Sequence, residues 1–204
     1  MENQRKKKSS RGAIAAGVFI ALYLVTYFII GAICMPVAVL FLIMPEVVAF
    51  FAAPTYHMML TKSPSWVPIL IAAFLPSLLL IASGHIPIAP VVAIPAGIIA
   101  ALIAKRGSYK SFKWNTISHM IFSWNLFGGF IPIWVMRDYF FQDTFERGMS
   151  QEFCDTLRAL TPWWVLPVMM IATALCSLLG SLFTKKVLNK HLTKAGVLLS
   201  LIHI

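Results

Sequence analysis

Residues 137–161 read RDYFFQDTFERGMSQEFCDTLRALT and form the only long polar interruption in a chain that is otherwise almost continuously apolar. The apolar runs before and after this stretch are long enough to cross a bilayer as helices, which takes about 20 residues. The stretch holds five of the seven acidic residues: Asp138, Asp143, Glu146, Glu152 and Asp155. The sequence therefore predicts a membrane protein with one elaborated polar face, where specific polar chemistry is held most easily.

The composition points to the same class. Hydrophobic residues make up 59% of the 204 residues, charged residues make up 12%, and the mean hydropathy is +0.83. A soluble domain carries about 25% charged residues. The net charge of +10 would suggest a nucleic-acid partner in a soluble protein, but here the basic residues lie between apolar runs and report membrane orientation. We therefore predict an all-α polytopic membrane protein, a compact bundle of about six transmembrane helices, with no nucleic-acid partner.

Six apolar runs are candidate spans, and the second is the least regular because it contains Pro36, Pro45 and Pro54. A five-span alternative, with this run partly re-entrant, stays open, since broken helices are tolerated where protein or a cavity satisfies the freed backbone groups. The first run is longer than a signal peptide's apolar region and lacks a clear cleavage pattern, so we expect it to be retained. The predicted spans are residues 12–33, 35–60, 66–84, 87–104, 115–136 and 162–184.

The basic residues predict the orientation of the bundle. Fourteen of the seventeen Lys and Arg residues fall in residues 1–11, 61–65, 105–114 and 185–204, which alternate with the spans. Because cytoplasmic loops are enriched in Lys and Arg, both termini are expected inside and residues 137–161 outside. We divide the chain into a basic N-terminus (1–11), a single bundle (12–184), a basic tail (185–198) and a tail at 199–204 that we expect to be non-native and adapter-derived.

Small residues on the first span offer one candidate interaction surface. Such residues let a second helix approach closely in lipid, so the pattern predicts either packing within the bundle or docking of a partner protein. The residues are Gly12, Ala13, Ala16, Gly17 and Ala21.

Polar and aromatic residues of the outer half are the candidates for binding a small molecule. Polar side chains within spans usually face the bundle interior or a water-filled cavity. Alternatives stay open: an exposed turn for the histidine, an interfacial aromatic belt for the aromatic residues, and a structural clamp for the Arg–Asp pair. The predicted substrate-binding residues are His85, Asn125, Trp134, Arg137, Asp138 and Tyr139.

Glu46 is a separate candidate, because an acid about 18 Å into a predicted span is a functional-site hypothesis by default. Protonation in place, or an interfacial position in a shorter span, would also explain it.

The three cysteines have neither disulfide-framework nor metal-ligand spacing, although a Cys34–Cys154 bridge is conceivable. We expect no metal and no cofactor. The chain has no Walker, H-E-x-x-H or G-x-S-x-G motif, so we expect a protein that is not an enzyme.

Several stretches resemble the Trep_Strep family of small integral membrane proteins, which is grouped with the substrate-binding (S) components of energy-coupling-factor (ECF) transporters. These stretches are Ser83-Gly84-His85, Tyr109-Lys110-Ser111-Phe112-Lys113, Ile131-Pro132-Ile133-Trp134-Val135-Met136-Arg137-Asp138-Tyr139-Phe140, Gln151-Glu152-Phe153, Ala159-Leu160-Thr161-Pro162-x-Trp164 and Lys185-Lys186-x-Leu188-x-Lys190-His191-x-x-Lys194-Ala195-Gly196.

The resemblance implies a six-helix S component of a bacterial cytoplasmic membrane. Such a subunit binds a vitamin, metal or other scarce nutrient from outside. It delivers the nutrient while docked, through the small-residue face of the first span, on a transmembrane coupling subunit driven by two ATPases.

Two alternative functions stay open. One is a stand-alone secondary transporter or channel with Glu46 and His119 on an ion path. The other is a membrane enzyme using His85 and the acids of residues 137–161.

Overall fold

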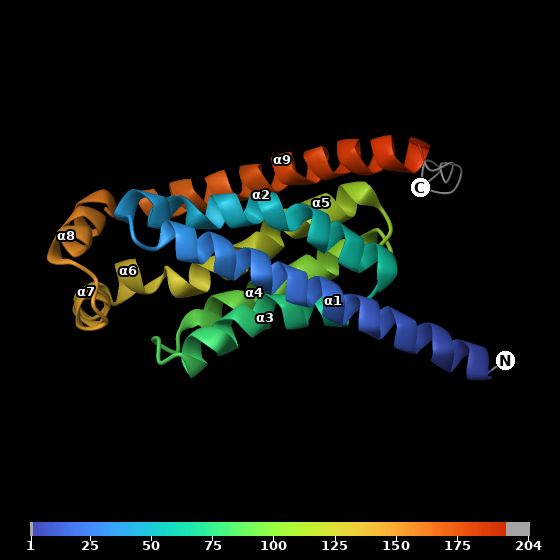
Figure 1. Cartoon of the computed structure of the whole chain (residues 1–204), viewed down its shortest axis with the longest axis horizontal. Helices are drawn as coiled ribbons and strands as arrows, with labels where there is room; N and C mark the ends of the chain where they lie inside the picture. Colours follow the sequence, from blue (N-terminus) through green and yellow to red (C-terminus); the bar gives the residue numbers. More distant parts are fainter. Residues whose placement is uncertain (1, 195–204) are drawn as a thin grey trace.

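The structure is a computed structural model that describes residues 2–194, with side-chain surroundings for residues 12–188. The described chain is helical apart from short connections (Figure 1). The tail predicted at 199–204 lies outside the described residues. The helices are α1 Glu2–Cys34, α2 Ala38–Lys62, α3 Trp66–Ala82, α4 Ala89–Arg106, α5 Phe112–Phe122, the 3-10 helix η1 Ser123–Gly129, α6 Pro132–Val135, α7 Arg137–Glu146, α8 Gln151–Leu160 and α9 Val165–Lys194.

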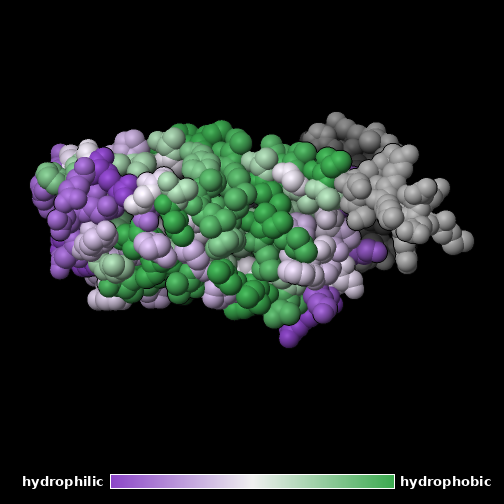
Figure 2. All heavy atoms as spheres, turned by 90° about the horizontal axis from the view of Figure 1, so that it is seen from below, coloured by the Kyte–Doolittle hydropathy of each residue, from purple (hydrophilic) through white to green (hydrophobic). Residues whose placement is uncertain are grey.

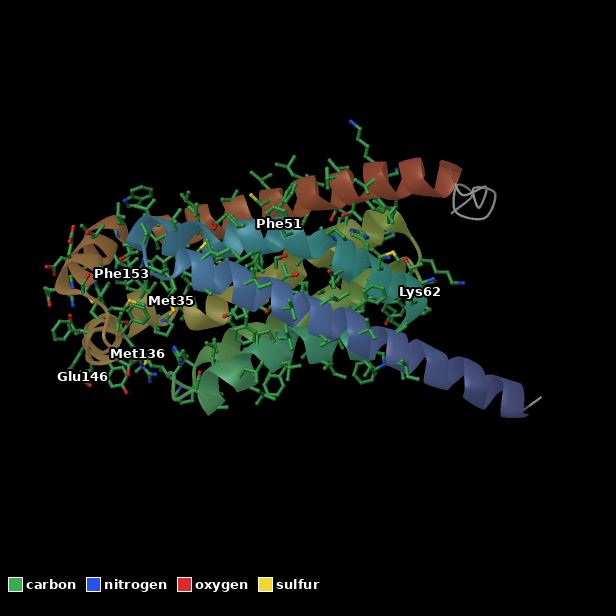
Figure 3. All side chains as sticks on the ribbon, in the orientation of Figure 1. Met35, Phe51, Lys62, Met136, Glu146 and Phe153 are labelled. Carbon is green, nitrogen blue, oxygen red and sulfur yellow. The ribbon has the colours of Figure 1, made fainter. Side chains whose placement is uncertain are left out.

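The long helices run side by side, and the short helices α6, α7 and α8 gather at one end of the bundle (Figure 1). The start of α1 and the end of α9 lie at the opposite end. Lys62 and Glu146 mark these two ends in Figure 3. A broad apolar surface lies between them and meets a hydrophilic cap formed at the end with α7 and α8 (Figure 2). This arrangement confirms the predicted class of an all-helical, multi-pass membrane protein.

Four described helices are long and apolar enough to cross a membrane: α1 from Gly12 on, α2, α4, and α9 up to Leu188. The other two predicted spans are shorter or broken. Helix α3 is apolar but has 17 residues, and the predicted span 115–136 is divided among α5, η1 and α6. The inside–outside orientation stays a prediction.

Helix α2 is continuous through Pro45 and Pro54, as the predicted span 35–60 requires, and the re-entrant alternative is not observed. Proline has no N–H, and Pro54 therefore leaves the Phe50 carbonyl without its usual helical donor. This carbonyl faces α9 where a glycine allows close approach: a Cβ on Gly180 would lie 2.4 Å from Phe50 O. Tight packing of α2 on α9 thus holds the proline-containing helix in one piece. Because α2 begins at Ala38, Glu46 lies about 12 Å along it, shallower than the sequence suggested.

The break after α5 has a local cause. Ser123 Oγ donates to the His119 carbonyl and Asn125 Nδ2 donates to the Phe122 carbonyl, so side chains compete for the acceptors of a regular helix. Gly128 packs directly on α4, because a Cβ there would lie 2.7 Å from Ala89 O. The irregular backbone is therefore enclosed by protein, as a membrane requires.

Residues 137–161 fold into two short helices across the end of the bundle. Ser150 caps α8 by accepting a hydrogen bond from Phe153 N, and α8 buries Phe153, Cys154 and Leu157. Cys34, Cys154 and Cys176 are all free, so the conceivable Cys34–Cys154 bridge is not present.

Candidate functional site

A cavity of about 390 Å³ lies at the α7–α8 end of the bundle. This volume falls within the range of small-molecule sites. Helices α1 and α2, the α3–α4 turn, η1, and the helices of the polar segment all contribute to it. Met35 and Phe153, which belong to its wall, are labelled in Figure 3. The lining residues are Tyr27, Phe28, Gly31, Ala32, Met35, Phe41, Met44, Leu80, Ser83, His85, Ile86, Ala89, Gly128, Gly129, Phe130, Pro132, Phe140, Asp143, Thr144, Arg147, Met149 and Phe153.

Most of the wall is aromatic or aliphatic. The rings of Phe41 and Phe130 stack with their centroids 4.7 Å apart, and Phe153 meets Phe41 edge-on at 6.0 Å. Together with Tyr27 and Phe140, these rings form flat surfaces that suit a planar apolar group. Gly128 and Gly129 also belong to the lining, and neither has room for a side chain: an added Cβ would lie 2.7 Å from Ala89 O and 3.3 Å from Leu80 Cδ1, respectively.

One side of the cavity is polar and is organised by Arg147 at the end of α7. Its Nε donates to Asp143 Oδ2 at 2.7 Å, and its two terminal nitrogens donate to the backbone carbonyls of Ser83 (3.3 Å) and Gly84. The Asp143 carboxylate raises the pKa of Arg147. Gly84 adopts φ +82°, a backbone conformation that favours glycine and turns its carbonyl region toward the arginine. Arg147 therefore fastens α7 to the α3–α4 turn.

His85 presents a hydrogen-bond acceptor on this polar side. The Ser83 hydroxyl donates to Leu80 O at 2.9 Å, so its oxygen accepts the bond from His85 Nδ1 at 3.0 Å. With Nδ1 carrying the hydrogen, neutral His85 keeps a lone pair on Nε2. Burial, and then the nearby Arg147, lower the pKa of His85 below its ordinary value, which favours this neutral form. Asp143 Oδ1 is a second acceptor, with no hydrogen-bond partner among the described residues.

Of the six predicted substrate-binding residues, His85 lines this cavity. Asn125 is buried elsewhere: its Oδ1 accepts from Tyr23 OH at 3.2 Å. Trp134 is also buried, and its Nε1 donates to Pro162 O at 3.1 Å. Asn125 therefore joins η1 to α1, and Trp134 joins α6 to the connection between α8 and α9.

Arg137, Asp138 and Tyr139 lie at the start of α7, away from the cavity lining. Arg137 donates to Thr161 O at 2.8 Å and to Arg158 O. Asp138 accepts from Arg158 at 2.9 Å, with a side chain 93% exposed. Tyr139 is exposed. The structure thus does not bring the six residues together, and their role in binding stays a prediction.

The cavity face of α7 was missed in the sequence, although it carried a signal. Phe140, Asp143, Thr144 and Arg147 all line the cavity. Their spacing of three, one and three places them on one side of a helix. Within the part of the chain that the structure describes, no group of three or more His, Cys, Asp or Glu residues could hold a metal ion.

Comparison with known protein families identifies the family of this chain. The family described as "Hypothetical bacterial integral membrane protein (Trep_Strep)" matches residues 10–194. The chain belongs to the Trep_Strep family. No curated protein and no solved structure matches the chain.

The small residues of α1 in this Trep_Strep protein divide between two faces. Ala16 is buried, and a Cβ on Gly12 would lie 3.6 Å from the Lys62 carbonyl of α2. Ala13, Gly17 and Ala21 are exposed, and a Cβ on Gly17 would meet nothing within 4 Å. The first pair therefore packs inside the bundle. The other three, spaced four residues apart, form an outward stripe.

Proposed function

We propose that this Trep_Strep protein is the membrane-embedded substrate-binding subunit of an ECF-type importer. In this role it captures a small nutrient, such as a vitamin, at the outer face of the bacterial cytoplasmic membrane. The observation that carries the proposal is the 390 Å³ cavity beneath α7, at the end of the bundle opposite Lys62 (Figure 3). An apolar cavity with a few convergent polar groups is the usual form of a small-molecule site.

The chemistry of the cavity wall indicates which class of nutrient would fit. The aromatic wall favours a flat apolar body. On the polar side, Arg147 is engaged with carbonyls and Asp143, whereas His85 Nε2 and Asp143 Oδ1 are acceptors. We therefore propose a planar molecule with an N–H or O–H group at one end. A free anion fits less well, because it would face two electron-rich atoms.

Delivery would require partners, namely a transmembrane coupling subunit and two ATPases, because the sequence contains no Walker motif of its own. The outward stripe of Ala13, Gly17 and Ala21 is the surface we propose for docking. Small residues on a lipid-facing helix allow the close backbone approach by which helices associate in membranes.

Co-purification tests this role. Gly17→Leu fills open space outside the bundle, so the protein should fold and keep its cavity but lose the coupling subunit and ATPases when purified from its native membrane. Gly17→Ala, which adds one methyl group, is the matched control and should retain them. Retention of the partners by Gly17→Leu would remove the docking assignment. Failure of the wild-type protein to carry any ATPase would argue against an importer subunit.

The orientation is tested by thiol labelling in a cysteine-free background. Glu146 is the last residue of α7, and Lys110 lies in the connection between α4 and α5 at the opposite end of the bundle (Figure 1). Both residues are exposed, and each is replaced by cysteine. An impermeant reagent should label the first in intact cells and the second only after lysis. The reverse pattern would place the cavity on the cytoplasmic side.

A stand-alone secondary transporter is the second candidate, and Glu46 favours it. This side chain is partly buried; Thr173 donates to its Oε1 at 3.2 Å, while Oε2 has no partner among the described residues. An unsatisfied acid within a span is typical of ion-coupled transport. Uptake that persists without the ATPases and is lost in Glu46→Gln would favour this candidate.

A further inference from the structure

Helix α9 carries a buried line of hydroxyl groups through the centre of the bundle. Thr173, Ser177, Ser181 and Thr184 are 2% exposed or less, and their spacing of four, four and three places them on one face. Three of them bond to other helices: Thr173 to Glu46, Ser177 to Ser123 Oγ at 2.6 Å, and Ser181 to two histidines. Polar groups within a membrane span must find such internal partners. The line shares no residue with the lining of the outer cavity.

Ser181 joins the two histidines through a single hydroxyl group. Its Oγ lies 2.9 Å from His57 Nε2 and 3.4 Å from His119 Nδ1. His119 is fully buried, and His57 is 5% exposed. The second nitrogen of His119, Nε2, is buried without a hydrogen-bond partner among the described residues. Leaving a buried polar atom unpaired costs about 1–3 kcal/mol, so a core selected for stability alone would avoid it.

The surroundings of the two rings hold few charges. The Tyr56 ring of α2 packs on the His119 ring with 4.9 Å between centroids. Asn115 and Ser118, which precede His119 on α5, are also buried. Phe112 stacks on His57 at 4.7 Å, and the Lys185 ammonium group of α9 lies 5.2 Å from the same Phe112 ring. The acid of α2, Glu46, precedes His57 by eleven residues, about 16 Å along the helix. Within the described residues packed here, the histidines exchange hydrogen bonds with hydroxyl groups and not with carboxylates.

We propose that His57, Ser181 and His119 form a buried proton-transfer unit. A hydroxyl group has one hydrogen, so it donates to one ring and accepts from the other. In the first arrangement, His57 Nε2–H donates to Ser181 Oγ, the Ser181 hydroxyl donates to His119 Nδ1, and His119 carries its hydrogen on Nε2. In the second, His119 Nδ1–H donates to Ser181, Ser181 donates to His57 Nε2, and His57 carries its hydrogen on Nδ1.

Conversion of the first arrangement into the second moves one proton and leaves both rings neutral. A proton binds His57 Nδ1, the hydrogen on His57 Nε2 passes to Ser181, the Ser181 hydrogen passes to His119 Nδ1, and His119 Nε2 releases its proton. One N–H bond forms and one breaks at each ring, and the hydroxyl exchanges one hydrogen for another. His57, the more exposed ring, is the end that takes up the proton, and the unpaired Nε2 of His119 is the end that releases it.

The two arrangements give an unusual signature, because both rings carry their hydrogen on Nε2 in the first and on Nδ1 in the second. Solid-state NMR of the full chain, labelled with 15N-histidine and embedded in lipid bilayers, measures the tautomer of each ring. Single His→Gln variants assign the signals. We expect both tautomers at His57 and at His119, with equal populations at the two rings. A single fixed tautomer at either ring, or unequal populations, would overturn the proposal.

Removal of the bridge supplies the second test. Ser181→Ala deletes only the hydroxyl group, so the tautomer populations of His57 and His119 should no longer be equal. Ser177→Ala, one turn away on the same face and bonded to Ser123, is the control and should leave them equal. Matched populations that survive in Ser181→Ala would contradict the unit. If Ser181→Ala does not fold, the tautomer populations of His57 and His119 in the wild-type protein still test the proposal.

Discussion

Arg137 begins α7 and Arg147 directly follows its last residue, and both donate guanidinium hydrogens to backbone carbonyls. Arg137 reaches Thr161 O at 2.8 Å and Arg158 O, at the end of α8. Arg147 reaches the carbonyls of Ser83 and Gly84 in the α3–α4 turn, more than 60 residues away in sequence. The same side chain and the same acceptor therefore make two different connections.

The difference lies in what each arginine joins. The last carbonyls of a helix have no intrahelical donors, and Arg137 satisfies them within the polar segment itself, as a C-terminal cap. Arg147 connects the polar segment to the membrane bundle across the cavity that it also lines. A residue that caps one helix stabilises the fold. A residue that joins two layers around a cavity also forms part of the cavity wall.

The largest effect on stability is expected for Arg137→Met. The variant removes charge-assisted hydrogen bonds to carbonyls that would then lack donors, so we expect unfolding to become easier by about 2 kcal/mol. Ligand binding should be unchanged once the protein is folded. Chemical unfolding in detergent measures the first, and calorimetry measures the second. Binding that weakens about tenfold with unchanged stability would return Arg137 to the binding site where the sequence placed it.

Arg147→Gln should show the opposite pattern. We expect binding to weaken about tenfold because α7 loses its attachment to the α3–α4 turn, while stability falls by about 1 kcal/mol or less, since the pair with Asp143 is partly exposed. Glu146→Gln, one residue earlier and exposed, is the control and should bind normally. Equal losses of stability in Arg137→Met and Arg147→Gln would erase the distinction between the two arginines.

The pH dependence tests His85 next to Arg147. Because the folded protein holds the pKa of His85 below the ordinary 6.5, the unfolded chain binds more protons just below that pH. The stability contributed by neutral His85 is therefore complete above about pH 6.5 and falls as the pH drops through the lowered folded pKa. Ligand binding should weaken over the same window, since protonation removes the acceptor on Nε2. His85→Gln should flatten both curves; a profile identical to wild type would assign the dependence to another group.

The smallest effect is expected at Asp138, which pairs with Arg158 on the outer surface. Its side chain is 93% exposed, so Asp138→Asn should change the free energy of unfolding by less than about 0.5 kcal/mol and leave binding unchanged. The same unfolding and calorimetric measurements apply. A large loss of binding would show that the surface beside Arg137, not the cavity beside Arg147, meets the ligand.

The sequence predicted the helical membrane class because bilayer thickness fixes how long an apolar run must be. It left open whether the second span is continuous, and it did not predict that the fifth span is divided after Phe122. Both outcomes depend on contacts distant in sequence, Gly180 against Phe50 and Gly128 against Ala89. Proline and glycine signal a break in isolation, and tertiary packing decides whether the break occurs.

The sequence indicated the region of the candidate site, but of the six predicted binding residues only His85 lines the cavity. His85 was found because a polar turn between apolar runs is conspicuous. Arg137 was proposed because it adjoins a predicted span, and Arg147 was not among the predicted binding residues. Which face of α7 meets the cavity depends on how the polar segment folds back over the α3–α4 turn, and local spacing does not encode that.

The central claim is that the cavity beneath α7 binds a small molecule, and native mass spectrometry of the purified protein tests it most directly. Ala32 lines the cavity, whereas its neighbour Ile33 is 65% exposed and does not. We predict that wild type and Ile33→Trp each retain a small molecule from cells grown in rich medium, and that Ala32→Trp, which fills the cavity, retains none. Equal retention by Ala32→Trp, or no bound molecule in any of the three proteins, would contradict the claim.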